Sequence, residues 1–379
     1  MTYPAVADID LDAFAANLAR VRSVSSAPNL MAIVKADAYG HGRAQCAQAA
    51  VQAGADYLGV AQLAEALTLR QEIGAGPRIL AWIYAHNEDL APALEADIDL
   101  SIGSFAALDA IEKAARATGK IARIHLKVDT AMARGGFDLD ELPDAVARTR
   151  ALEQAGLVRT VGLWSHLARA DEPDNPLTAT QVERFEQART IAARAGLDIE
   201  LHHLAASAGT LWHPNTHYDM VRPGIALYGL SPDLTVATAS ELGLKAVMTL
   251  SAPLIRTRDV PAGTGISYGH TAHTETDQRL GLVPLGYADG ISRSASNRAP
   301  LVVAGERTHI IGRVCMDQFL VPVPPTVTEG ERAWLFGDAA AGLPTVDEWA
   351  QTMGPIGYEL VTHIGVRVPR RFTGAEVGS

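Results

Sequence analysis

Between residues 30 and 230, short apolar runs rich in β-branched residues alternate with longer Ala-rich segments of helical spacing. We place the expected strands at residues 30–35, 57–61, 78–83, 98–102, 122–129, 160–166, 199–205 and 217–222. The intervening segments carry helix-end signals, such as Ser104 before and Gly119 after one of them. About eight strand–helix repeats are typical of a (β/α)8 barrel. An open doubly wound sheet is the alternative, because a strand count from one sequence does not distinguish the two.

After about residue 235 the pattern changes to short strands set between Pro and Gly residues, with almost no helical period. These strands fall at residues 246–260, 280–286, 300–314, 319–324 and 331–338. A single helix is expected at 345–354. We therefore predict two domains, a barrel over residues 1–235 and a β-rich domain over 236–379.

Composition and charge narrow the class of protein. The chain has 379 residues, of which 48% are hydrophobic and 20% charged, as in ordinary soluble proteins. Its net charge of −11 argues against nucleic acid or an anionic membrane as a partner. No apolar run approaches the roughly 20 residues of a membrane span, and no signal peptide is visible. Two distant cysteines, Cys46 and Cys315, suggest no disulfide framework, so we expect a reducing cytoplasm.

Polar side chains at the carboxyl ends of the expected strands form the candidate site. Lys35 ends the apolar run "MAIVK" and precedes a Gly-rich turn. A lysine at a strand end is as often a solvated terminus as a functional group. In a barrel, however, these ends converge on one mouth, where a partly desolvated lysine is a nucleophilic amine. The same position selects Trp82, Lys127, Asp129, His166, the segment 203–207 and Arg222.

The loop "RPGIALYG" follows the last strand and would present the N–H groups of Gly224 and Ile225 to the mouth. Barrels commonly bind phosphate there. An amine, a phosphate site and an arginine together suit a phosphorylated aldehyde, and pyridoxal phosphate is the commonest such cofactor. No metal is expected: Pro214 breaks the "HPNTH" segment, and His202 and His203 point to opposite faces of their strand.

Several segments closely resemble, in order and over nearly the whole chain, the motifs of the alanine racemase family. They are "AIVKADAYGHG", "KVDTAMARGG", "WSHLARADE", "MVRPGIALYGL", "GISYGHT", "VPLGYADG" and "GRVCMDQF". The resemblance implies a pyridoxal-phosphate enzyme with an N-terminal barrel and a C-terminal β domain. It further implies a homodimer with shared active sites that interconverts L- and D-alanine and supplies D-alanine for cell-wall peptidoglycan.

The resemblance also implies roles for individual residues. Lys35 is similar to the lysine that holds the cofactor and serves as one base, and Tyr268 to the second base, which comes from the other subunit. Arg222 resembles the arginine that faces the pyridine nitrogen. The other matches are Tyr39, Ser207, Gly224 and Ile225 near the cofactor phosphate, Arg134 and the Met316 backbone on the substrate carboxylate, Tyr287 and Asp317 where substrate enters, and Lys127, which is carbamylated in some members. Trp82 and His166 complete the expected cofactor pocket.

Elementary chemistry agrees with these roles. Racemisation removes a proton from one face of the α-carbon and returns it to the other, so two bases must flank a planar carbanion. A phenol titrates near pH ~10, so a tyrosine base needs cationic neighbours, for which we expect His166 and Arg222. A guanidinium keeps its proton, which leaves the pyridine nitrogen unprotonated and the ring a weaker electron sink. Transamination should then be suppressed.

The chain departs from the family pattern at three positions. Ala206 stands where an Asn often precedes the phosphate serine, Ala131 where many members have Gly, and Val366 where some members place a tyrosine on the phosphate.

Three alternative functions stay open. They are a racemase of the same fold for other amino acids such as serine or lysine, a single-domain pyridoxal-phosphate carrier, and a decarboxylase that uses a cysteine such as Cys315.

Overall fold

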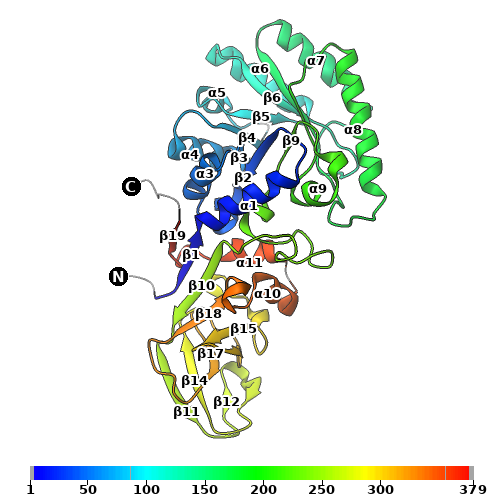
Figure 1. Ribbon diagram of the computed structural model, residues 1–379. Coiled ribbons are helices and arrows are strands. Elements are labelled where there is room, and N and C mark those ends of the chain that lie inside the picture. Colours follow the sequence, from blue (N-terminus) through cyan, green and yellow to red (C-terminus); the bar gives the residue numbers. More distant parts are fainter. Residues whose placement is uncertain (1–3, 86, 355, 375–379) are drawn as a thin grey trace.

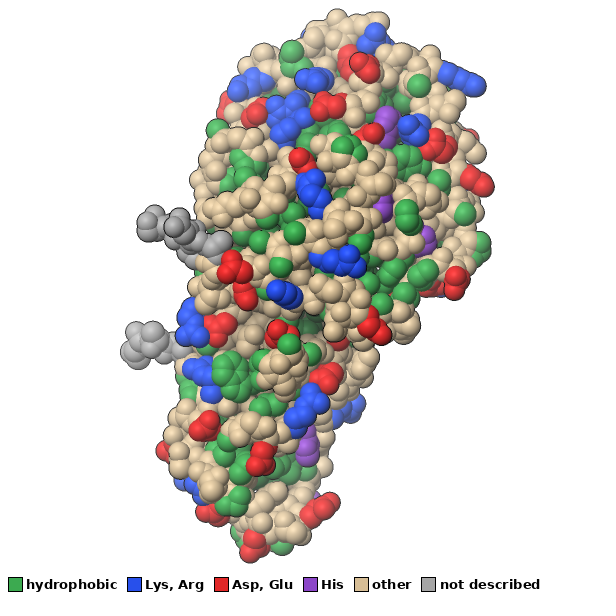
Figure 2. All heavy atoms as spheres, in the orientation of Figure 1, with side chains coloured by type: hydrophobic (Ala, Val, Ile, Leu, Met, Phe, Trp, Pro, Cys, Tyr) green, Lys and Arg blue, Asp and Glu red, His purple; other side chains and the backbone are tan. Residues whose placement is uncertain are grey.

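The computed structural model describes residues 4–85, 87–354 and 356–374. The chain forms two lobes, a barrel surrounded by helices and a smaller β-rich domain (Figure 1). On the face shown in Figure 2, acidic and basic side chains are interspersed over both lobes. Within the described part of the chain, no helix combines the length and the apolar character needed to cross a membrane.

Eight parallel strands form the first lobe, in the order β8-β7-β6-β5-β4-β3-β2-β9. They are β2 (Asn29–Ile33), β3 (Tyr57–Gln62), β4 (Arg78–Ile83), β5 (Asp99–Ile102), β6 (Ala122–Lys127), β7 (Val158–Trp164), β8 (Leu201–His203) and β9 (Met220–Val221). The sheet closes just beyond β8 and β9, where Ala206 bridges Arg222 in parallel and Arg222 N donates to Ala205 O at 2.9 Å. The predicted barrel is thereby confirmed, and the open sheet is excluded.

The barrel strands are buried on both faces, by each other's side chains inside the barrel and by helices outside it. The helices and short turns of this lobe lie around the barrel and at its mouth (Figure 1). They are α1 (Leu11–Val24), α2 (Lys35–Gly40), α3 (Arg43–Gln52), α4 (Leu63–Ile73), α5 (Ala91–Glu95), α6 (Phe105–Thr118), α7 (Leu142–Gln154), α8 (Leu177–Arg194) and α9 (Ser207–Trp212), with the 3₁₀ turns η1 (Pro214–Thr216) and η2 (Ile225–Tyr228). The expected caps are present on α6. Ser104 Oγ accepts from Ala107 N at 3.2 Å, and Gly119 is left-handed at φ +67°.

The second lobe contains a six-stranded sheet in the order β16-β15-β18-β10-β1-β19, a three-stranded sheet β11-β14-β17 and the pair β12-β13. Its strands are β1 (Val6–Asp10), β10 (Met248–Pro253), β11 (Arg256–Val260), β12 (Gly265–Ile266), β13 (Ala272–His273), β14 (Gln278–Val283), β15 (Pro300–Val303), β16 (Glu306–His309), β17 (Phe319–Val323), β18 (Arg332–Phe336) and β19 (Arg370–Thr373). The helices are α10 (Val346–Met353), at the predicted position, and α11 (Gly357–His363). Short 3₁₀ turns complete it, namely η3 (Tyr268–His270), η4 (Tyr287–Asp289), η5 (Arg293–Ala295) and η6 (Ala339–Ala341).

The N-terminal strand β1 was not among the predicted strands. It pairs antiparallel with β10 and parallel with β19, so it belongs to the sheet of the second lobe. A boundary at residue 235 would assign this strand to the barrel instead. The reason it escaped prediction is that "VADID" has only three apolar residues, and its partners lie about 240 and 360 positions later along the chain.

The two lobes meet behind the turn that follows β2. Gly40, at φ +79°, lies so close to α11 that a Cβ atom there would be 2.3 Å from the carbonyl oxygen of Val361. Arg370 Nε also donates to Gly40 O at 2.9 Å. The second lobe therefore supports the turn that carries Lys35 and Tyr39.

Candidate active site

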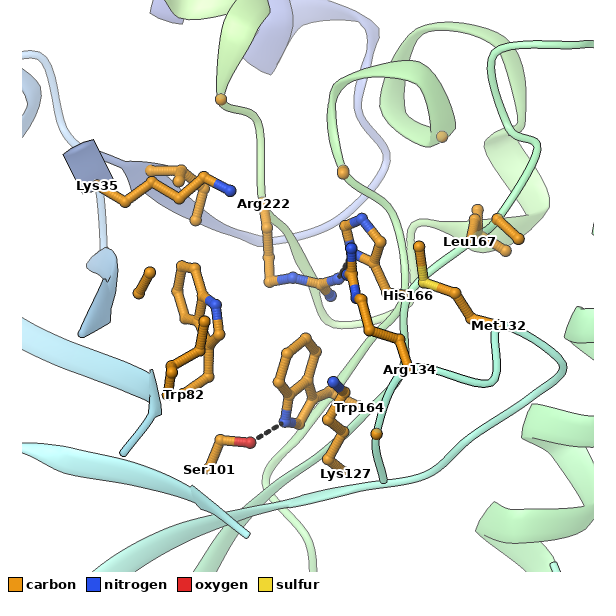
Figure 3. Close-up of a pocket in the computed structure, with 18 of the residues that line it drawn as sticks. Lys35, Trp82, Ser101, Lys127, Met132, Arg134, Trp164, His166, Leu167 and Arg222 are labelled. Atoms are coloured by element: carbon orange, nitrogen blue, oxygen red, sulfur yellow. Dashed lines mark hydrogen bonds between the residues drawn. The ribbon is translucent and has the colours of Figure 1, made fainter. Parts of the chain in front are cut away.

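A cavity of about 1020 Å³ opens at the carboxyl ends of the barrel strands. Its lining includes the predicted residues Lys35, Tyr39, Trp82, Lys127, Arg134, His166, Ser207, Arg222, Gly224 and Ile225. Figure 3 shows Lys35 on one side of this space, with Arg134, His166 and Arg222 across from it. The structure thus brings these barrel residues together in one pocket, whereas Asp129 and residues 203–205, which the same strand-end position selected, do not line it.

Lys35 follows β2 and Val34, and its side chain is partly buried in the cavity. Burial, together with the positive charge of Arg134, lowers the pKa of Lys35, while Glu65 opposes the shift. Its Nζ atom lies 5.8 Å from the centre of the Tyr39 ring. A lysine in this setting has an increased share of the neutral, nucleophilic amine.

The turn after Lys35 is left-handed, although it contains no glycine until residue 40. Four consecutive residues, Ala36 to Tyr39, have φ between 52° and 54°. Two hydrogen bonds hold this turn: Ala36 N donates to Glu65 Oε1 at 2.6 Å, and Arg43 N donates to Asp37 Oδ1 at 2.8 Å. An L-residue in this region costs about 1–2 kcal/mol, so the surrounding contacts maintain a strained turn that brings Tyr39 into the pocket.

Ser207, Gly224 and Tyr39 form a small polar cradle. Ser207 Oγ accepts from Gly224 N at 2.9 Å and from Ala226 N at 3.3 Å, and its hydroxyl proton can still be donated. A Cβ atom on Gly224 would lie 2.3 Å from Tyr39 Oη, so the space beside Tyr39 requires a glycine here. The N–H groups of Gly224 and Ala226 hold Ser207 Oγ, which leaves the hydroxyl groups of Ser207 and Tyr39 as donors at the mouth of the cavity, and hydroxyl donors suit a phosphate group.

Arg222 lies at the bottom of the cavity and is 4% exposed. It donates to Ser165 O (2.8 Å), Leu204 O (3.1 Å), His203 Nδ1 (3.1 Å) and His166 Nδ1 (3.3 Å). Burial lowers its pKa to about 9, so it remains mostly cationic at neutral pH. Its guanidinium carbon is 5.0 Å from the centre of the Trp164 ring, and Trp164 Nε1 is fixed by a 2.9 Å hydrogen bond to Ser101 Oγ (Figure 3).

His166 does not supply the positive charge that the sequence led us to expect. Burial lowers its pKa well below the ordinary value, and the charges of Arg222, Arg134, Lys35 and Lys127 add to the effect. The imidazole is therefore neutral at pH 7. It accepts a hydrogen bond from Arg222 instead of acting as a second cation.

Lys127 and Arg134 lie at the edge of the cavity nearest β6. Lys127 Nζ is 5.0 Å from the centre of the Trp164 ring. Burial lowers the pKa of Lys127, as do the charges of Arg134 and Arg222, with Asp129 opposing. Arg134 belongs to a loop in which Asp129 Oδ1 accepts from the backbone N–H groups of residues 131 and 132.

The remaining predicted residues lie in the second lobe, outside the lining of this cavity. Tyr268 is 70% exposed, Met316 53% and Tyr287 44%. Tyr268 lines a separate hollow of about 270 Å³ with Ser267 and Cys315. Met316 O accepts from the residue after Tyr287, and Asp317 pairs with Arg367 at 2.9 Å. Among the described residues, a single chain therefore does not bring Tyr268 to Lys35.

Two aromatic pocket residues that lie near predicted ones were not singled out from the sequence. Tyr358 on α11 lines the cavity, with its ring centre 6.2 Å from that of Tyr39. Trp164 ends β7 and lies between Arg222 and Lys127. Trp164 could have been selected by its strand-end position. The expectation about Val366 was wrong, because Val366 is fully exposed and does not line the pocket, where the second-lobe tyrosine is Tyr358.

Comparison with known proteins gives the same two-part division. Residues 9–232 match the family model "Alanine racemase, N-terminal domain", and residues 247–372 match "Alanine racemase, C-terminal domain". The chain is 50% identical to an alanine racemase from Beutenbergia cavernae over 99% of both chains. It is 48% identical to one from Thermobifida fusca over 98% of both.

Solved structures are also similar over the full length. The alanine racemase from the D-cycloserine-producing Streptomyces lavendulae superimposes with a TM-score of 0.97 at 44% identity, covering 99% of this chain and 98% of that one. The alanine racemase from Streptomyces coelicolor gives 0.96 at 45% identity, covering 98% of this chain and 99% of that one.

Proposed function

The chain belongs to the alanine racemase family and catalyses the racemisation of alanine. From that premise we propose that the barrel cavity holds pyridoxal phosphate on Lys35 and that two bases exchange the α-proton. The observation that carries the proposal is the convergence in one cavity of a partly buried amine with a lowered pKa, a cradle of hydroxyl and N–H groups, and a buried arginine.

Different residues of the cavity would bind the phosphate, the pyridine nitrogen and the aldehyde carbon of the cofactor. Ser207 and the N–H groups near Gly224 and Ile225 would hold the phosphate, with Tyr39 and Tyr358 beside it. Arg222 would face the pyridine nitrogen. Lys35 Nζ would bond to the aldehyde carbon with loss of water, and the substrate amine would then take its place there and release Lys35 as a free amine. When bound, the cofactor withdraws electrons from the substrate α-carbon and makes its proton removable.

The chain supplies the proton transfers. Lys35 takes or returns the α-proton at its Nζ atom, and its lowered pKa leaves more of it able to act as a base near neutral pH. Tyr268 of a second copy acts at its hydroxyl oxygen on the opposite face. Arg134 binds the substrate carboxylate together with the backbone at Met316 of that second copy, while Tyr287 and Asp317 border the approach of substrate.

Arg222 has a second task, which is to limit side reactions. A guanidinium donates hydrogen bonds and keeps its proton even with its pKa lowered to about 9. The pyridine nitrogen that it faces would then stay unprotonated, which weakens the electron sink and favours return of the proton to the α-carbon over transamination.

Lys127 is proposed to be carbamylated when carbon dioxide is present. The lowered pKa of Lys127 leaves an amine that can attack the carbon of CO₂, forming a C–N bond and releasing one proton. The resulting anion would lie among the cations Arg134 and Arg222 and would orient Arg134. Mass measurement after isotopic labelling with ¹³CO₂ and chemical trapping tests this assignment.

The experiment that tests the proposed function is direct. Purified protein is assayed with L-alanine by loss of optical rotation, with L-serine and L-lysine as competing substrates. Borohydride reduction should fix the cofactor irreversibly, and mass spectrometry should place it on Lys35. An adduct on Lys127 or Lys120 would overturn the assignment of Lys35.

Growth of a D-alanine-requiring bacterium that expresses the chain tests the proposed supply of D-alanine for peptidoglycan.

A further inference from the structure

A series of polar side chains crosses the interior of the barrel, which branched apolar residues normally fill. From the mouth inward, it runs from Arg222 through His203 on β8 and His125 on β6 to Asp99 on β5. The last three are fully buried, and Arg222 is 4% exposed. Asp99 and His125 are not in the lining of the cavity, so neither can touch a ligand held there.

Three hydrogen bonds link the series. Arg222 Nη1 lies 3.1 Å from His203 Nδ1, His203 Nε2 lies 2.9 Å from His125 Nδ1, and His125 Nε2 lies 3.3 Å from Asp99 Oδ2. A guanidinium can only donate, and an ionised carboxylate can only accept. A single assignment of protons satisfies all three contacts, in which both imidazoles carry hydrogen on Nε2 and accept on Nδ1.

The surroundings hold both rings in place. The His203 ring stacks on Trp164, with centroids 5.7 Å apart and planes inclined by 3°. On β7, a Cβ atom at Gly162 would lie 2.1 Å from His125 Nδ1, so the glycine makes room for that imidazole. The position and orientation of the two rings are therefore specified by the neighbouring strands.

The hydrogen-bonded series has a charged group at each end, the Asp99 carboxylate and the Arg222 guanidinium. Burial raises the pKa of Asp99, but the His125 hydrogen bond and the guanidinium groups of Arg78 and Arg123 outweigh it, so the carboxyl pKa lies below its usual range. Asp99 Oδ2 is 2.8 Å from Arg78, and Oδ1 is 2.6 Å from Arg123. Burial and the nearby Arg222 charge keep the pKa of His203 well below normal. Neutral His203 thus separates Arg222 from the His125–Asp99 pair.

We propose that Asp99 and His125 are positioning residues for racemisation, acting through His203 to direct a lone pair at Arg222 and so orient its guanidinium. This inference rests on the proposed function, because it takes Arg222 to face the cofactor ring. Without the Asp99 carboxylate, the two imidazoles are free to adopt the other tautomer. His203 would then present an N–H group to Arg222, and a donor facing a donor forces the guanidinium to move.

The chain offers a matched pair of variants. Asp97 and Asp99 both pair with Arg123 at the base of the barrel, but of the two only Asp99 contacts His125. Asp99→Asn has one acceptor oxygen in place of two. The donors Arg78 and Arg123 compete with His125 for it, so the NH2 group can face His125 Nε2. This variant should lower kcat by about ten-fold, the effect of one lost hydrogen bond, while leaving KM for alanine within about two-fold. It should also raise the pyruvate formed per racemisation, since a displaced Arg222 no longer keeps the ring nitrogen unprotonated. Asp97→Asn should change neither quantity, and equal behaviour of the two variants in cofactor-loaded enzyme would overturn the inference.

A second pair of variants tests the hydrogen bonds rather than the charge. His125→Gln keeps an acceptor for His203 and a donor for Asp99, whereas His125→Leu, of similar size, has neither. The Gln variant should retain several-fold more activity and a lower pyruvate ratio than the Leu variant. Equal values in the two variants would show that only packing matters at this position, and would contradict the inference.

A spectroscopic measurement does not depend on any variant folding well. Nitrogen NMR of the wild-type protein, labelled with ¹⁵N-histidine, should show His203 and His125 protonated on Nε2 alone. A proton on Nδ1 of either ring overturns the inference. This result is separate from the proposed function, which fails instead if the wild-type protein takes up no pyridoxal phosphate.

Discussion

At the scale of single residues, several histidines are kept neutral by burial. Burial lowers the pKa of His41 to about 4, although hydrogen bonds to the Tyr39 and Ala38 carbonyls oppose the shift. His166, His203 and His217 have lowered pKa values for the same main reason. Their neutrality links the stability of the protein to pH.

We expect the free energy of unfolding to fall as the pH drops below about 6.5, the ordinary pKa of histidine. Above that value neither state binds the proton. Between this value and the lower pKa of the folded state, these histidines bind a proton in the unfolded chain but not in the folded protein, which stabilises the unfolded chain. For His41 the interval from 6.5 to about 4 amounts to about 3 kcal/mol.

The contribution of His41 can be isolated with His41→Asn, which keeps a donor for the backbone carbonyls and removes the titration. Between pH 7 and 4.5 this variant should lose less stability in urea unfolding than the wild type. His309→Asn, on the exposed strand β16, is the matched control and should follow the wild-type curve. A wild-type pH slope in His41→Asn would contradict the assignment.

Ala131 lies at φ +98°. An alanine with positive φ is strained by about 1–2 kcal/mol, whereas the added backbone freedom of glycine costs about 0.5–1 kcal/mol. Ala131→Gly should therefore raise the free energy of unfolding by up to about 1.5 kcal/mol. Ala262→Gly, at an exposed position without positive φ, should lower it by about 0.4–1 kcal/mol. Denaturant unfolding measures both, and a loss of stability in Ala131→Gly would contradict the strain.

At the scale of elements, the loop before η2 meets the left-handed turn of α2 at the proposed phosphate cradle. Gly224→Ala should reduce affinity for pyridoxal phosphate by ten-fold or more, because the new methyl group would lie 2.3 Å from Tyr39 Oη. Titration of the cofactor-free protein, followed by absorbance, measures this affinity.

Tyr39→Phe in the same chain supplies the control for that prediction. It removes the hydroxyl that the methyl group would meet, so the double variant should bind the cofactor more tightly than Gly224→Ala alone. Additive losses in the double variant would mean that the two side chains do not compete for the same space.

The barrel strands and the residues at their carboxyl ends were accessible from the sequence, because both depend on local patterns. Continuous burial gives parallel strands an apolar run, and a polar residue such as Lys35 or Arg222 marks its end. The left-handed turn was not predictable, since Ala36 to Tyr39 lack the glycines that normally signal positive φ. Tyr358 and the contact of Asp99 with His125 depend on tertiary packing that brings distant parts of the chain together.

At the scale of the whole molecule, the division into two lobes separates the two proposed bases. Lys35 lies at the barrel mouth, supported from behind by α11 of its own second lobe. Tyr268 follows β12, which lies at the far end of the second lobe from the barrel (Figure 1). Its exposed fraction of 70% leaves it available to another chain. A two-fold dimer would place the Tyr268 surface of each chain over the barrel mouth of its partner, with both sites equivalent.

Mixing two inactive chains tests this arrangement. We expect Lys35→Ala and Tyr268→Phe each to be nearly inactive alone, since each lacks one base. In a shared-site dimer of one chain of each kind, one active site carries both substitutions and the other carries neither. Random pairing makes about half of the dimers mixed, so about a quarter of all sites should be intact after the chains are refolded together. If each chain instead built its own site, every site would keep one lesion. Racemisation that stays at the level of the single variants would then exclude the shared site.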